Sequence, residues 1–174
     1  DSFLLNACSS YEQGMAMIEA GAIGGVVTLR EVINSGAVKV GKTMARLLNR
    51  GFPLRAALDL AQGETVIGEQ YIVVGDGELA IAQSESGTPV YFEVEKQDGV
   101  YMTEFNTYPT TQRGMGSMIM PMVDDEYQHY LNSGNVDTFE LTKNELIRLL
   151  SLENLPVIVD GSIEWSGEMD FASL

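Results

Sequence analysis

The chain has 174 residues, 45% of them hydrophobic and 20% charged, which is the composition of a folded globular protein and excludes a disordered one. A net charge of −15 disfavours phosphate binding and anionic surfaces, so we expect neither nucleic acid nor a membrane as a partner. The single cysteine excludes an internal disulfide, and with it a secreted disulfide framework.

The first elements predict an α/β layer. Residues 3–7 form a short apolar run typical of a buried strand. Ser9 or Ser10 then caps a helix that ends at Gly21. Residues 22–29, rich in valine, isoleucine and glycine, predict a second strand parallel to the first. The strand–helix–strand order favours a right-handed crossover.

Two more helices and two more strands are predicted before the middle of the chain. A loop over residues 30–34 leads into a long helical pattern that ends at Gly51, and Pro53 begins the next helix. Residues 71–74 predict a third strand and residues 79–82 a short fourth one.

Charge and composition change near the middle of the chain. Residues 1–83 hold 6 basic and 9 acidic side chains, whereas residues 84–174 hold 4 and 16. The change coincides with the polar, turn-rich residues 83–89. We therefore predict two domains, residues 1–83 and residues 84–174.

The second domain has the pattern of a β-rich α+β domain. Asp98-Gly99 is typical of a hairpin turn, and Thr142 with Glu145 forms a capping box before one amphipathic helix. The clearest predicted strands are residues 90–95, 100–105, 156–160 and 162–165. We predict an acidic accessory domain.

Cys8 is the main candidate for chemistry. It stands at the carboxyl end of a predicted parallel strand and just before a helix, where ligands bind to α/β sheets and where a thiolate is stabilised. A thiolate attacks acyl carbons when a base and an oxyanion site are nearby. Asn6, Ser9 and Ser10 flank it and are candidates for substrate binding or the oxyanion site. A structural interpretation explains the same residues equally well: Asn6, Ser9 and Ser10 end the strand and cap the helix, and Cys8 is a small buried hydrophobic residue.

The residues around Cys8 belong to an ordered series that spans about residues 3–83. The series comprises Leu5-Asn6-Ala7-Cys8-Ser9-Ser10, Gly14, Ala20-Gly21-Ala22, Val26-Val27-Thr28-Leu29, Met44-Ala45-Arg46-Leu47-Leu48, Gly51-Phe52-Pro53-Leu54-Arg55-Ala56-Ala57-Leu58 and Tyr71-Ile72-Val73-Val74-Gly75-Asp76. It resembles the CHAT family of caspase-like cysteine peptidases. The resemblance implies the C-terminal half of a caspase-like α/β domain, with a partial parallel sheet and flanking helices. It also implies that Cys8 is the nucleophile that attacks a peptide carbonyl.

The chain departs from this family in its general base, which in the family is a histidine beside a glycine on an earlier strand. The one histidine here, His129, lies in the second half, and we expect it at the surface rather than beside Cys8. Gly77 replaces a frequent proline, which we expect to change only a turn. Because the chain enters an apolar strand directly after Asp1, we expect it to be a piece of a longer polypeptide that carries the base. The resemblance thus implies part of a cysteine endopeptidase that acts on protein or peptide substrates, or an inactive caspase-like interaction module.

A phosphate-binding loop is the second alternative. Residues 36–43 fit the pattern G-x-x-x-x-G-K-T, and the apolar run that ends at Asp76 could supply a magnesium ligand. Residues 30–35 separate the pattern from its strand, and Val38 and Val40 resist positive φ angles. The apolar spacing favours a helix here instead.

We predict no metal and no cofactor. The methionines at 118, 120 and 122 offer soft ligands, but their alternation is typical of a strand that faces a core. The acidic residues 124–126 lack the spacing of a calcium loop and indicate a solvated turn.

The surroundings of the chain are also predicted from composition. The longest apolar run, residues 20–29, is about half as long as a membrane-spanning helix, and no basic and apolar leader is present, so we expect a cytoplasmic protein. Many acidic groups with few lysines fit a halophilic protein that stays soluble in high salt, where screening removes self-repulsion.

Overall fold

The computed structural model describes residues 1–63, 65, 68–83, 89–108, 138–151 and 155–172. The chain divides into two compact units, Asp1–Glu85 and Ser86–Leu174. The division falls within the polar residues 83–89, where the composition changes. We call them unit 1 and unit 2 and describe each by itself.

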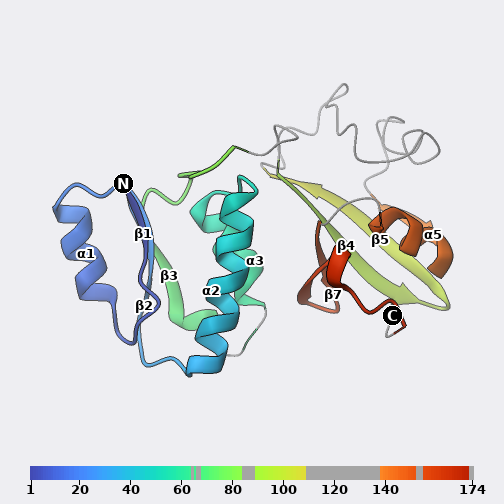
Figure 1. Ribbon diagram of the computed structural model, residues 1–174, viewed down its shortest axis with the longest axis horizontal. Helices are drawn as coiled ribbons and strands as arrows, with labels where there is room; N and C mark the ends of the chain where they lie inside the picture. The colour runs from blue at the N-terminus through green and yellow to red at the C-terminus, as the bar shows by residue number, and fades with distance from the viewer. Residues whose placement is uncertain (64, 66–67, 84–88, 109–137, 152–154, 173–174) are drawn as a thin grey trace. The chain divides into compact units, whose positions relative to one another are not determined.

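Unit 1 contains a three-stranded sheet in the order β1-β2-β3 (Figure 1). The strands are β1 (Ser2–Leu4), β2 (Gly24–Thr28) and β3 (Tyr71–Gly75). β1 pairs with β2 in parallel, as predicted. The resemblance implied a partial parallel sheet, but β3 runs antiparallel to β2, so the sheet is mixed and its parallel pairing is limited to β1 and β2.

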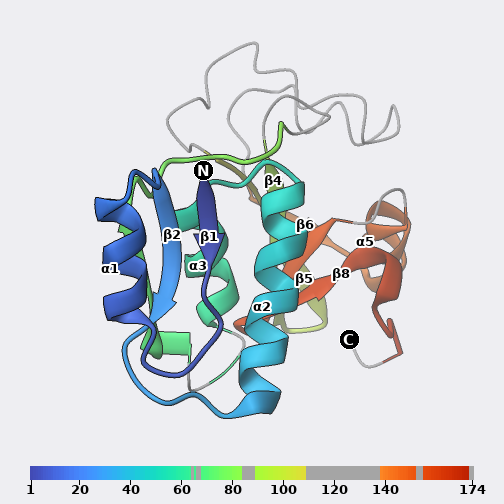
Figure 2. The same cartoon turned by 60° about the vertical axis from the view of Figure 1, so that its left-hand side comes forward.

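Helices cover both faces of this sheet. They are α1 (Tyr11–Glu19), α2 (Asn34–Asn49) and α3 (Leu54–Gln62), and the short 3-10 helix η1 (Gly68–Gln70) precedes β3. Figures 1 and 2 show α1 on one face of the sheet and α3 on the other, with α2 packed against α3. The predicted α/β layer is therefore present.

The core of unit 1 lies between the sheet and these helices. Val26 and Val27 of β2 are fully buried, as are Val40 and Met44 of α2. Gly14 allows α1 to approach β2 closely, because a Cβ at this position would lie 2.3 Å from the Val27 side chain. The small residue on α1 is thus a requirement of helix–sheet packing.

The predicted fourth strand at residues 79–82 was wrong, because this segment has no strand structure. Its neighbourhood instead completes the start of α3. The N–H of Leu54 donates to the carbonyl of Leu79 at 3.1 Å, and the N–H of Arg55 donates to the carbonyl of Gly77 at 2.9 Å. Pro53, the residue before α3, has no side-chain acceptor for these N–H groups, so the backbone carbonyls of Gly77 and Leu79 serve as the acceptors.

Unit 2 contains a five-stranded sheet in the order β6-β5-β4-β7-β8. Its elements are β4 (Val90–Gln97), β5 (Val100–Thr107), β6 (Thr138–Leu141), α5 (Lys143–Leu150), β7 (Pro156–Val159), β8 (Ser162–Trp165) and the 3-10 helix η3 (Ser166–Glu168). β4 and β7 are parallel, and every other neighbouring pair is antiparallel. The capping box of Thr142 and Glu145 at the start of α5 is confirmed.

The alternation predicted for β4 separates two faces of this sheet. Val90, Phe92 and Val94 are buried, and the Phe92 ring meets the Phe105 ring edge-on, with 5.2 Å between the ring centroids. The buried leucines of α5 join the same core. The opposite face carries Glu93 and Glu95, so one face packs and the other is charged.

Several sequence features lie outside the described residues, namely His129, the methionines at 118, 120 and 122, and the acidic residues 124–126. None of the helices in the described part of the chain combines the length and the apolar character needed to cross a membrane.

Candidate functional site

Cys8 is an exposed residue with a free thiol. Cys8 lies in the loop of residues 5–10, which we call the thiol loop, between β1 and α1. Its sulfur contacts the backbone of Val32: the Val32 N–H donates to Sγ at 3.5 Å, and the thiol faces the Val32 carbonyl at 3.7 Å. Val32 precedes the N-cap residue of α2, so the sulfur also lies near the positive end of that helix.

A buried pair of hydroxyls ties the thiol loop to β2. Ser10 Oγ donates to the carbonyl of Leu5 at 3.1 Å and accepts from the N–H of Thr28 at 2.9 Å. Thr28 Oγ1 donates to the carbonyl of Ala7 and accepts from the N–H of Ser10 at 3.3 Å. Each hydroxyl therefore serves as donor and acceptor, and together they fix the loop on both sides of Cys8.

A second set of contacts ties the thiol loop to α2 and β3. Asn6 Nδ2 donates to the carbonyl of Ala37 at 2.7 Å. The Tyr71 hydroxyl donates to Asn6 Oδ1 at 2.6 Å. Because the Ala37 carbonyl needs a donor, the amide nitrogen faces α2, and the tyrosine must provide its own proton to the amide oxygen.

The four predicted site residues therefore have different surroundings. Cys8 and Ser9 are exposed, and Ser9 has a positive φ of 52°. Ser10 is 3% exposed, and its hydroxyl bonds within the protein. The Asn6 amide bonds to Ala37 and Tyr71. Tyr71, Thr28 and Val32 are neighbours of the thiol loop that no sequence pattern indicated.

Residues 36–43, which fit the phosphate-loop pattern, lie inside α2, as the helical spacing predicted. Packing, and not phosphate binding, explains the glycine at position 41. It stands one helical turn after Ala37, and a Cβ there would lie 2.8 Å from Asn6 Nδ2. The glycine leaves room for the amide that anchors the thiol loop to the helix.

The Tyr71 hydroxyl titrates at higher pH than an ordinary tyrosine. Burial raises the pKa of Tyr71 above 10.0, and the charge of the nearby Cys8 thiolate raises it further. Tyr71 therefore stays protonated at neutral pH, which its bond to Asn6 requires.

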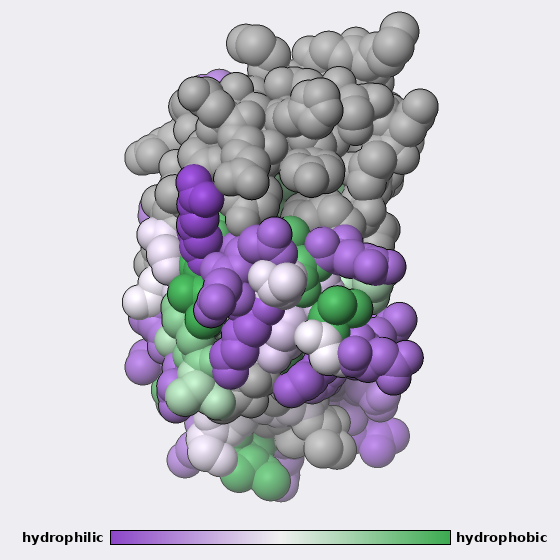
Figure 3. Space-filling view, turned by 90° about the vertical axis from the view of Figure 1, so that its right-hand side faces the viewer, coloured by the Kyte–Doolittle hydropathy of each residue, from purple (hydrophilic) through white to green (hydrophobic). Residues whose placement is uncertain are grey.

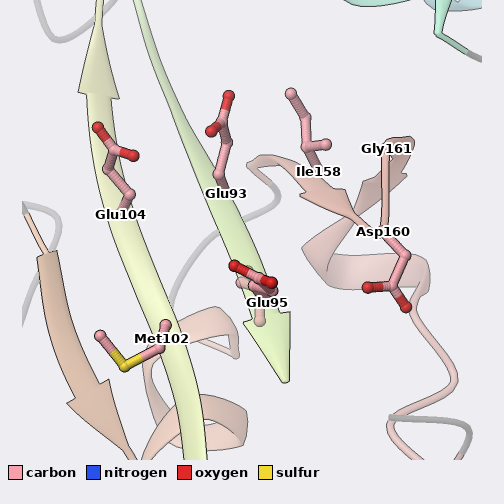
Figure 4. Close-up of a pocket in the computed structure, with 8 residues that line it drawn as sticks. Glu93, Glu95, Met102, Glu104, Ile158, Asp160 and Gly161 are labelled. Atoms are coloured by element: carbon pink, nitrogen blue, oxygen red, sulfur yellow. The ribbon is translucent and has the colours of Figure 1, made fainter. Parts of the chain in front are cut away.

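Unit 2 has a groove of about 510 Å³ on its charged sheet face. Figure 4 shows the side chains of Glu93, Glu95 and Glu104 on β4 and β5, with Asp160 at the β7–β8 turn. Burial raises the pKa of Glu93, and the charge of Glu104, its cross-strand partner, raises it further. Among the residues coloured by hydropathy in Figure 3, hydrophilic ones predominate.

No group of three or more metal-binding side chains was found within the described ranges. The structure is of the mixed α/β class, with two mixed sheets. No family model, curated protein or solved structure matches this chain.

Proposed function

We propose that this chain is part of a CHAT-like cysteine endopeptidase, with unit 1 as part of its caspase-like domain and Cys8 as its nucleophile. The observation that supports this most is the exposed thiol of Cys8 beside the N–H of Val32. A sulfur that is open to solvent and next to a backbone donor can react as an anion, whereas a buried structural cysteine is inert.

In the proposed reaction the sulfur of Cys8 adds to the carbonyl carbon of a peptide bond. A histidine takes the thiol proton and passes it to the leaving amine, and water then hydrolyses the thioester. This histidine belongs to a strand earlier in a longer polypeptide. β1 pairs with β2 on one side, and no pairing on its other edge occurs among the strands described here, which leaves a place for such a strand.

Within this proposal the other candidate residues have separate roles. Ser9 follows the nucleophile and is exposed, so its side chain is placed to meet the substrate. Asn6 and Ser10 support the thiol loop through bonds inside the protein. The acidic β-rich unit 2 is an accessory domain.

Cleavage by the full-length protein tests the proposal. Peptide hydrolysis should fall by a factor of about 1,000 or more in Cys8→Ala, because loss of a nucleophile removes the covalent route. Ser9→Ala is the matched control and should retain hydrolysis with weaker substrate binding. The thiol should also react with iodoacetamide faster than free cysteine does.

Two results together would remove the peptidase proposal: alkylation of Cys8 no faster than that of a free thiol, and hydrolysis unchanged in Cys8→Ala. The chain would then be better described as a caspase-like interaction module without catalytic activity.

A further inference from the structure

Two segments far apart in the sequence meet at the thiol loop through Asn6. Its amide nitrogen bonds the carbonyl of Ala37 at 2.7 Å, and its amide oxygen accepts from the Tyr71 hydroxyl at 2.6 Å. The tyrosine ring is 1% exposed, so the hydroxyl comes from a rigid part of the core. Gln62 Nε2 further fixes the start of β3 by donating to the carbonyl of Tyr71 at 2.9 Å.

The sulfur and the Asn6 amide contact the same stretch of chain. Cys8 Sγ accepts from the N–H of Val32, and Asn6 donates to the carbonyl of Ala37, which belongs to the first turns of α2. One contact is weak, at 3.5 Å to sulfur, and the other is a short amide hydrogen bond. The stronger bond therefore sets the distance at which the weaker one forms.

We propose that Tyr71 is a positioning residue for Cys8, which acts through Asn6 to hold the sulfur against the N–H of Val32. The Tyr71 hydroxyl orients the Asn6 amide, and the amide fixes the thiol loop to α2. The Val32 N–H then stabilises the sulfur as it gains negative charge. The inference rests on the proposed function for its purpose, but its test is the chemical reactivity of the thiol.

Tyr71→Phe is the informative variant because it keeps the buried ring and removes only the hydroxyl. In the 174-residue chain, we expect iodoacetamide to alkylate Cys8 about fivefold more slowly, which corresponds to the loss of one ordinary hydrogen bond. Cys8 is the only thiol, so the rate is read directly. Tyr11→Phe, on an exposed residue of α1, is the matched control and should not change the rate.

A double-mutant cycle separates positioning from general loosening. Asn6→Ala should slow alkylation at least as much as Tyr71→Phe does, because it removes the bonds to both Tyr71 and Ala37. The double variant should be no slower than Asn6→Ala alone, because Tyr71 acts through Asn6. If Asn6→Ala does not fold, Asn6→Asp replaces it, since aspartate still accepts from Tyr71 but cannot donate to Ala37. Hydrogen exchange at the Val32 N–H should become faster in each variant, while exchange in β2 stays unchanged.

An alkylation rate in Tyr71→Phe within experimental error of wild type would overturn the inference, as would effects that multiply in the double variant. Failure of the proposed function has a different signature. Alkylation of wild-type Cys8 no faster than that of a free thiol, together with unchanged hydrolysis in Cys8→Ala, removes the peptidase and leaves the differences in alkylation rate between the variants as they were measured.

Discussion

Replacing Thr28 by valine removes one hydroxyl from the buried pair that ties the thiol loop to β2. Thr28 is fully buried, and valine has nearly the same shape. The hydroxyl donates to the carbonyl of Ala7 and accepts from the N–H of Ser10. The substitution therefore leaves the buried N–H of Ser10 and the partly buried carbonyl of Ala7 without this partner and puts a methyl group between them.

The expected loss of stability follows from these two groups. An unsatisfied buried polar group costs about 1–3 kcal/mol. The bonds of Ser10 Oγ to Leu5 and to the Thr28 backbone remain, so the rest of the network persists. We expect Thr28→Val to lower the free energy of unfolding of unit 1 by about 2–4 kcal/mol.

Urea unfolding measures this loss in each unit separately. Far-UV circular dichroism follows mainly unit 1, because α1, α2 and α3 contribute more helix than α5 of unit 2, and the fluorescence of Trp165 follows unit 2 alone. Thr103→Val in unit 2 is the matched control. Thr103 is also fully buried, but its hydroxyl bonds a carbonyl at 3.5 Å, so we expect a loss below about 1 kcal/mol.

A loss below about 1 kcal/mol in Thr28→Val would refute the reasoning, because the hydroxyl would then not be satisfying two buried groups. A shift of the Trp165 transition in this variant would also contradict it, since Thr28 lies in unit 1.

Four further outcomes are expected. Glu93→Gln should raise the free energy of unfolding of unit 2 in urea at pH 7 by less than about 1 kcal/mol, because the raised pKa of Glu93 means that its charge opposes folding above pH 4.5. Thr142→Ala should lower the free energy of unfolding of unit 2 by about 1 kcal/mol at pH 7 and by less in acid. The hydrogen bond from the Thr142 side chain is the main cause of the lowered pKa of Glu145, so the cap weakens as the pH falls below 4.5. Unit 1 should lose stability as the pH rises above 10.0, because the unfolded chain releases the Tyr71 proton at a lower pH than the folded chain does. Carbon NMR of the tyrosine rings should show a lower pKa for Tyr71 in Cys8→Ser than in wild type, because the thiolate charge is gone, yet a pKa still above 10.0, because burial remains. The free energy of unfolding in urea should rise by about 1 kcal/mol or more between 0.1 and 2 M KCl, because screening relieves the repulsion within a net charge of −15; no gain would remove the high-salt hypothesis.

Local patterns predicted much of the secondary structure. The apolar spacing of residues 36–48 identified α2 even though the phosphate-loop pattern competes with it. A helix that packs on one side needs an apolar residue on that side about once per turn. The Asp98-Gly99 turn was also found, since both residues have the positive φ angles that Asp-Gly favours in a tight hairpin.

Long-range geometry was not accessible in the same way. The apolar residues of β3 predict a buried strand but not whether it runs parallel or antiparallel to its neighbour, so its antiparallel pairing with β2 could not be predicted. Tyr71 and Asn6 are far apart in the sequence, and a hydrogen bond between them leaves no periodic signal. Residues 79–82 were apolar enough for a strand, but the nearby carbonyls serve the start of α3 instead.

The parallel contact between β4 and β7 has a consequence for how unit 2 acquires its structure. The β4–β5 and β7–β8 hairpins are local and each closes through an Asp-Gly turn, so each can form within about 1–10 μs. The pairing of Phe92 with Val157 joins them across a long stretch of chain. We expect this closure to be the slow event of folding, and a circular permutant of unit 2 that links the segment after β8 to the start of β4 should refold faster.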